Sequence, residues 1–278
     1  MDEGFDQRVG PPEVLDASGA AEYRAPGIAT VLIAFATGFA LAALLGGAGV
    51  FLFQDSLAAL FFLAEVGLLG GVVAYLAASG RRVAEDLRAG PVPTATYPLA
   101  VKLGIALLLA NFAATALLGP PIRDIEFVAA TESAAERIVL TVTIALAAPV
   151  IEEALFRGLL QGALEARLRP WLAIALAAMP FALLHGPLPA IFFFFWSLPV
   201  GWVTWRTGSI RPGVVVHALN NMVGLIGLLT AGSLEAESVE RGAGAMMLAV
   251  AVLVLAALWA VRLCRRIGLV AGATAINR

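Results

Sequence analysis

Apolar runs of about 20 residues recur along nearly the whole sequence and constrain the fold more than any other feature. A helix needs roughly 20 such residues to cross a hydrocarbon layer about 30 Å thick. Of the 278 residues, 60% are hydrophobic and 14% are charged. This pattern predicts an all-α, polytopic integral membrane protein, a bundle of about eight transmembrane helices. The expected spans are 27–53, 56–79, 97–118, 136–166, 170–185, 189–206, 210–231 and 244–263.

The positions of the basic residues predict the orientation of these spans. When eight spans alternate in direction, most of the 18 Lys and Arg fall on one side, and only Arg123, Arg137 and Arg241 fall on the other. Short loops rich in Lys and Arg stay in the cytoplasm. We therefore expect a multi-pass protein of a bacterial-type cytoplasmic membrane with both termini cytoplasmic. Nothing in the composition indicates a nucleic-acid partner.

The chain divides into two expected regions. Residues 1–26 contain six carboxylates with several Gly and Pro, which predicts a disordered acidic tail, and residues 27–278 form the transmembrane helical bundle. Between spans, Ser79 to Gly90 predicts a short surface helix that anchors the topology. Residues 119–136 predict a solvated connection.

The fourth span places three ionisable residues near the bilayer centre, where such groups are costly and usually mark function. Glu153 and Arg157 are four residues apart, so they lie on one helical face and can pair. Successive residues of an α-helix point about 100° apart, so Glu152 lies on a different face of the helix from Glu153. The spacing therefore predicts one structural carboxylate, Glu153, and one that is available for proton transfer, Glu152.

The only two histidines lie near the other unexpected polar residues. His185 follows Phe181 by four residues, and His217 precedes Asn221 by four, so each pair lies on one face of its helix. The expected span that contains His185 (170–185) and the span that follows it (189–206) are both short, and Pro180 lies inside the first of them. Broken helices at membrane depth occur where protein or water surrounds them, so we expect a cavity here.

This set of side chains fits peptide hydrolysis, which needs a base for water, an acid for the leaving amine and donors for the oxyanion. Glu152 and His185 are expected to hold and activate the water. His217 and Asn221 are expected to donate hydrogen bonds to the carbonyl oxygen as it becomes negative.

Structural interpretations stay open beside this one. Glu153 and Arg157 can form an ion pair that orders helices, and Asn220 is expected to hydrogen-bond between helices. Glu65 is an isolated carboxylate that either lines the same cavity or pairs with an arginine. The tryptophans of the sixth span predict a membrane-interface belt, or else one wall of a substrate groove; they are Trp196, Trp202 and Trp205.

Three sequence motifs resemble those of a known family. EEALFR, FALLH and HALNN resemble the E-E-x-x-x-R, F-x-x-x-H and H-x-x-x-N motifs of the CAAX-protease and bacteriocin-processing (CPBP) family of intramembrane glutamic peptidases. The resemblance covers roughly residues 137–231, the expected protease core. It implies an eight-helix bundle with a water-accessible site that cleaves membrane-associated or lipidated proteins near a terminus.

The resemblance also implies roles for individual residues. By motif position, Glu152 and His185 activate water, and His217 and Asn221 form the oxyanion hole. A supporting role falls to the remaining motif residues, which are Glu153, Arg157 and Phe181.

Three rival functions have to be weighed. Two histidines and a glutamate could bind zinc for the same hydrolysis, but there is no HExxH and asparagine is a poor zinc ligand, so we expect no metal or other cofactor. A non-catalytic immunity or scaffolding protein would keep the fold and use the groove for binding. A proton-coupled transporter would show repeated halves, and the sequence has none.

Overall fold

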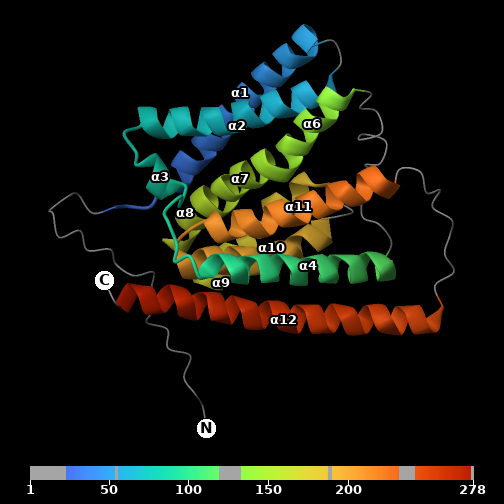
Figure 1. The fold of residues 1–278 in the computed structure, drawn as a ribbon. Helices are drawn as coiled ribbons and strands as arrows, with labels where there is room; N and C mark the ends of the chain where they lie inside the picture. The colour runs from blue at the N-terminus through green and yellow to red at the C-terminus, as the bar shows by residue number, and fades with distance from the viewer. Residues whose placement is uncertain (1–22, 54–55, 119–132, 187–189, 232–241, 277–278) are drawn as a thin grey trace.

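The computed structural model describes residues 23–53, 56–118, 133–186, 190–231 and 242–276, and this part of the chain is helical without strands. Each of the eight expected spans coincides with a helix (Figure 1). The segments are α1 Ile28–Phe53, α2 Leu57–Ala78, α3 Val83–Asp86, α4 Thr96–Leu118, α6 Ala134–Val142, η1 Thr143–Ala147, α7 Ala148–Glu152, η2 Glu153–Leu160, α8 Gln161–Glu165, α9 Pro170–Leu184, α10 Ala190–Thr207, α11 Arg211–Ala231 and α12 Ala243–Ile276.

Five helices in the described ranges are long and apolar enough to cross a membrane. They are Ile28–Phe53, Leu57–Ala78, Thr96–Leu117, Ala134–Glu165 and Ala243–Gly272. Many large apolar side chains are exposed, such as Phe112 at 60% and Leu255 at 66%, as expected for surfaces that face lipid. The predicted all-α, polytopic membrane fold is confirmed, whereas crossings by the shorter α9 and by α10 and α11 stay predictions.

The helices pack as neighbouring pairs around one apolar centre. Helix α1 packs on α2, α12 lies along α4, α9 lies beside α10, and α11 contacts α4 (Figure 1). Residues such as Leu103, Leu155, Val200 and Val216 are completely or almost completely buried in the core cluster. This centre also contains the polar residues of the candidate site.

The fourth span is one continuous helix with two π-helical stretches. Ser133 begins it with a capping box, because its hydroxyl accepts from the Glu136 backbone N–H while the Glu136 carboxylate accepts from the Ser133 backbone. The π-helical stretches are η1 and η2, and η2 begins at Glu153. Hydrogen bonds from residue i to i+5 are rare and occur mostly at functional sites. Glu152 and Glu153 lie where an α-helical stretch changes into a π-helical one.

Helix α9 ends at Leu184, directly before His185. Pro180 lies inside the helix, as expected, and His185 is its C-terminal cap. Gly186 follows with φ of 95°, a left-handed conformation that favours glycine at the end of a helix. The chain therefore turns directly after the His185 side chain, and residues 187–189 of the predicted joint lie outside the described residues.

The segment between α2 and α4 is more than a surface anchor. It contains the short helix α3, as predicted, but the Asp86 side chain is buried, contrary to a purely superficial helix. Asp86 accepts hydrogen bonds from Arg81 at 2.6 and 2.8 Å and from the Tyr23 hydroxyl at 3.0 Å. Asp86 can be buried in this short helix because a carboxylate that has a bidentate arginine partner is stable inside protein.

The same segment fixes the beginning of α11. Ile210 donates its backbone N–H to the Arg88 carbonyl at 3.0 Å, and the Ser209 hydroxyl donates to the Gly90 carbonyl at 2.6 Å. Because α11 carries His217 and Asn221, these bonds help to set the position of the candidate site. Residues 1–22 of the predicted tail lie outside the described residues, as do residues 119–132 of the predicted connection.

Helix α12 is longer than predicted. The apolar run suggested an end at residue 263, whereas the helix continues to Ile276. Arg262, Arg265 and Arg266 are therefore helical and exposed. The hydropathy pattern marked where the apolar run stops, which need not coincide with the end of the hydrogen-bonded helix.

Candidate active site

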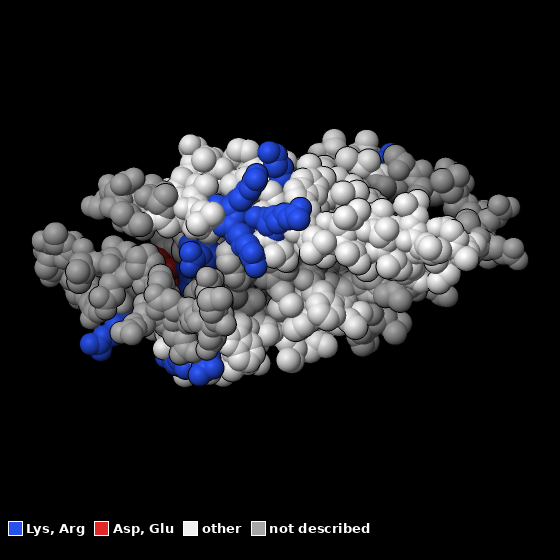
Figure 2. All heavy atoms as spheres, turned by 90° about the horizontal axis from the view of Figure 1, so that it is seen from below, with Lys and Arg blue, Asp and Glu red and all other residues white. Residues whose placement is uncertain are grey.

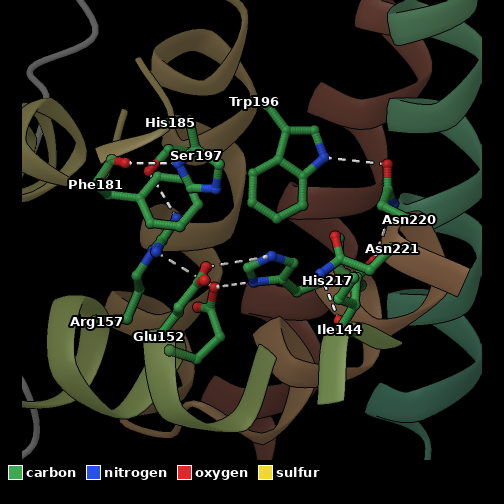
Figure 3. Close-up of polar contacts among 12 residues, drawn as sticks. Ile144, Glu152, Arg157, Phe181, His185, Trp196, Ser197, His217, Asn220 and Asn221 are labelled. Atoms are coloured by element: carbon green, nitrogen blue, oxygen red, sulfur yellow. Dashed lines mark hydrogen bonds and ion pairs between the residues drawn. The ribbon is translucent and has the colours of Figure 1, made fainter. Parts of the chain in front are cut away.

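His217 lies between the two neighbouring carboxylates of the fourth span. Its Nδ1 is 3.0 Å from Oε1 of Glu153, and its Nε2 is 3.6 Å from Oε2 of Glu152. The spacing predicted that the two carboxylates would point about 100° apart, whereas both reach the same ring, each at a different nitrogen (Figure 3). Helix α11 thus contacts the fourth span where α7 passes into η2.

Arg157 and Glu153 form a fully buried ion pair. Arg157 Nη1 lies 3.3 Å from Glu153 Oε1, and the two side chains are 1% and 0% exposed. The guanidinium also donates from Nη2 to the Ser197 hydroxyl at 2.8 Å and lies 4.0 Å from the centre of the Phe181 ring. Arg157 therefore connects the fourth span to α9 and α10 through one charge.

Counted formally, the Glu153–Arg157 pair leaves the charge of Glu152 unbalanced. Glu152, Glu153 and Arg157 carry two formal negative charges and one positive charge, and His217 lies beside both carboxylates. The Glu152 side chain is 21% exposed and the Glu153 side chain 0%, so Glu152 is the less buried of the two carboxylates, although its Oε2 is buried.

His185 lies on the other side of the Phe181 ring. The ring centres are 4.8 Å apart for Phe181 and His185 and 5.8 Å apart for Phe181 and His217. His185 stacks on Phe193 and bonds through Nδ1 to the Phe181 carbonyl at 2.8 Å. Within the described ranges, no hydrogen bond or ion pair joins His185 to Glu152.

Asn221 lies one turn beyond His217, as its spacing predicted. Its Nδ2 donates to the Ile144 carbonyl in η1 at 2.9 Å. One amide hydrogen is thereby used to hold the side chain, and the second remains for another acceptor. Figure 3 shows Asn221 and His217 next to each other on α11.

Asn220 makes the predicted hydrogen bonds between helices. Its Nδ2 donates to the carbonyl of Gly104 in α4 at 3.2 Å, and its Oδ1 accepts from the Trp196 indole at 3.2 Å. The Trp196 ring centre is 4.8 Å from that of His217, and Trp196 is only 6% exposed. An interface-belt position for Trp196 is therefore wrong, because its N–H has a buried partner.

Glu65 of α2 faces the same region. Its Oε2 is buried without a hydrogen-bond partner in the described part of the chain, and its charge is close enough to interact with that of Glu152. Of the two alternatives for this residue, these facts favour a place beside Glu152 over a pair with an arginine. Glu152 Oε2 is likewise buried without a hydrogen-bond partner there.

Two neighbours of the ion pair have little signal in the sequence. Ser197 is a single hydroxyl inside an aromatic run, and its contact with Arg157 depends on how α10 packs. Gly213 precedes His217 by four residues, and a Cβ there would lie 2.9 Å from Glu153 Oε2. A glycine at this position leaves the space that the carboxylate occupies. Only its position one helical turn before His217 could have drawn attention to it.

In the described ranges, no group of three or more His, Cys, Asp or Glu side chains could hold a metal ion. The cluster has one imidazole and two carboxylates, and the second imidazole lies beyond Phe181.

Comparison with known proteins supports the resemblance. Residues 134–223 match the family model described as type II CAAX prenyl endopeptidase Rce1-like. Searches of curated proteins and of solved structures gave no match. The matched residues contain all three motifs, the two π-helical stretches and the contacts of His217. The predicted resemblance to CAAX proteases is confirmed over this part of the chain, which is similar to the Rce1-like family of type II CAAX prenyl endopeptidases.

Proposed function

We propose that the protein is a glutamic intramembrane endopeptidase that hydrolyses a peptide bond near a terminus of a prenylated or otherwise lipidated membrane protein. The family match supports a CAAX-type membrane protease in general. The glutamic mechanism is proposed because His217 lies 3.0 Å from Glu153 and 3.6 Å from Glu152. A positioned ring between a buried and a partly exposed carboxylate fits a proton-transferring centre.

The proposed chemistry begins at Glu152. Its carboxylate takes a proton from water as the water oxygen bonds to the carbonyl carbon of the scissile peptide. The same proton then moves to the leaving nitrogen when the C–N bond breaks. General acid–base catalysis by one side chain supports rates about 10²- to 10⁴-fold higher, and the partial exposure of Glu152 gives the water access.

Glu153 and Arg157 support this role without touching the substrate. The His217 ring N–H at Nδ1 donates to Glu153, which fixes the orientation of the ring and directs Nε2 toward Glu152. Arg157 in turn lies 3.3 Å from Glu153 Oε1 and gives this buried carboxylate a partner of opposite charge. The Glu153–Arg157 pair is therefore a positioning device.

His217 and Asn221 supply the proposed oxyanion hole. Both lie on α11 one turn apart, and the second amide hydrogen of Asn221 and a proton on His217 Nε2 are the donors. Donors fixed before the reaction stabilise the charge that develops on the carbonyl oxygen. The bond from Asn221 to Ile144 holds the amide in place.

His185 keeps its proposed role in water activation, but from the far side of Phe181. Its ring is partly exposed at the end of α9. A substrate backbone that enters between His185 and Glu152 would have water on one face and the α11 donors on the other. Displacement of Phe181 from its stack would bring the two groups closer.

The test is Glu152→Gln in the purified protein reconstituted in liposomes with a farnesylated peptide. We expect cleavage to fall by about 10²- to 10⁴-fold, with thermal stability close to that of wild type because the shape of the side chain is kept. Glu136→Gln is the control, since Glu136 lies in the same helix but caps its exposed end. Full cleavage by Glu152→Gln would refute the proposed base.

Two further measurements separate the rival functions. Cleavage that continues at the full rate after exhaustive chelation, and that added Zn²⁺ does not increase, would exclude the zinc-dependent version. A cellular phenotype that Glu152→Gln leaves intact would favour a non-catalytic immunity or scaffolding role.

A further inference from the structure

A second feature of the bundle is an apolar groove away from the carboxylates. Helices α4, α10 and α12 enclose a cavity of about 690 Å³. Leu107 of α4, Ile191 of α10 and Leu253 of α12 are among its lining residues. The volume lies within the range of small-molecule sites, and the lining is almost entirely apolar.

The groove has one charged end. Arg265 is part of its lining, together with Trp202 on the same side. Arg262 and Arg266, beside Arg265 on α12, are also exposed. Figure 2, viewed from the side on which α12 lies, shows Lys and Arg gathered on this surface next to a long uncharged stretch. An anionic group therefore finds its complement at this end.

The length of the groove matches one leaflet of a bilayer. From Leu253 to Arg265, α12 rises about 18 Å at 1.5 Å per residue. Half of a hydrocarbon layer about 30 Å thick is about 15 Å. Trp202 lies near the charged end, as tryptophans do at the headgroup level. A chain that starts at Arg265 would reach the middle of the bilayer at Leu253.

We propose that this groove binds an anionic phospholipid, with its phosphate at Arg265 and one acyl chain along α12 toward Leu253. The occupant would touch Trp196, which lines the groove and whose ring lies 4.8 Å from that of His217. Bound lipid would thus support the wall of the candidate site. The proposal does not depend on catalysis, because lipid binding can be measured in protein that cleaves nothing.

The probe for the test is phosphatidylglycerol with a photoactivatable acyl chain, added to the full-length protein in phosphatidylcholine nanodiscs. Crosslinks are expected on residues 253–261 of α12 and 191–199 of α10. Arg265→Gln should reduce labelling about fivefold, the weight of one basic residue on anionic lipid. Arg262→Gln is the matched control, since Arg262 is exposed on the same helix but does not line the groove.

A second pair of variants tests the groove itself. Ala257→Trp fills it and should reduce labelling at least fivefold, whereas Leu258→Trp changes an exposed neighbour outside the lining and should have no effect. Equal labelling by the phosphatidylcholine analogue, or no loss with Arg265→Gln, would overturn the proposal. Displacement of the probe by a farnesylated peptide would also overturn it, because the groove would then belong to the substrate's lipid. Repeating the measurement with Glu152→Gln separates these results from the activity.

Discussion

The α1–α2 hairpin and the contact between the fourth span and α11 show two ways of holding helices together in the same chain. In the hairpin the backbones approach through glycines: a Cβ on Gly67 would lie 2.7 Å from the Leu41 carbonyl, and one on Gly71 would lie 2.6 Å from that of Thr37. At α11 the contact is polar, through His217 and the two carboxylates.

The difference teaches what each contact is for. Lipid tails are as apolar as leucine, so helices in membranes associate through close packing and hydrogen bonds. The hairpin uses packing alone, and its stability depends on shape. The polar contact carries charge into the bilayer, which costs free energy that packing does not require. The proposed proton transfer at Glu152 would account for that cost.

The largest predicted effect comes from breaking the buried ion pair. Arg157→Met should lower the free energy of unfolding by about 3–5 kcal/mol, because it leaves the Glu153 carboxylate buried without its partner. Unfolding in a detergent–SDS series measures this. The double variant Glu153→Leu, Arg157→Met should recover most of the loss. Stability of the single variant equal to that of wild type would show that Arg157 does not hold the contact.

The next effect separates the two neighbouring asparagines. Asn221→Ala should lower kcat by about 10²- to 10³-fold, the usual effect of removing one oxyanion donor. Asn220→Ala should cost only about 0.6 kcal/mol of stability, an average for hydrogen bonds between helices in membranes. Cleavage kinetics and unfolding on both proteins make the comparison. Equal kcat values would contradict the donor role of Asn221.

A smaller effect is expected in the hairpin. Gly71→Ala should destabilise the protein by about 1–3 kcal/mol, because the new methyl overpacks against α1. Gly70→Ala is the matched control, since its nearest neighbour would be Leu41 at 3.8 Å. Cleavage per folded molecule should stay unchanged in both. A loss of kcat in Gly71→Ala without a loss of stability would show that the hairpin acts on the site.

The smallest effect lies outside the membrane. Burial, and then the negative charge of Asp86, raise the pKa of Tyr23 above its ordinary value of 10.0. The unfolded chain therefore loses the tyrosine proton first as the pH rises, so this contribution is intact below pH 10 and is lost above it. Melting curves from pH 8 to 11 should show a steeper fall for wild type than for Tyr23→Phe. Parallel pH dependences for wild type and Tyr23→Phe would contradict this contribution of Tyr23 to stability.

Most of the fold followed from one physical property of the sequence. Long apolar runs fix where helices form in a membrane, and all eight expected helices are present. The ends were less certain: α12 continues through Arg262 and Arg265 to Ile276, because charged residues end an apolar run without ending a helix.

The candidate site was predictable where spacing along one helix decides the geometry. Glu153 and Arg157 pair as their four-residue separation indicates. Contacts between helices were not readable in the same way. Tryptophan is a residue type typical of membrane interfaces, yet the packing of α10 against α11 buries Trp196 beside His217. Asp86 lies in a charged segment and is buried between the nearby Arg81 and Tyr23, which is 63 residues away in the sequence.

The π-helical and α-helical parts of the fourth span respond differently to the loss of a residue. A residue removed from η1 would let that turn return to α-helical hydrogen bonding and leave the flanking faces where they are, because a π-helical turn holds about one residue more than an α-helical turn. A residue removed from the α-helical α7 would instead rotate everything beyond it by about 100° relative to what precedes it. Glu152 and Glu153 would then face away from α11, while the length and hydropathy of the span would hardly change. A single codon could therefore separate membrane insertion from catalysis.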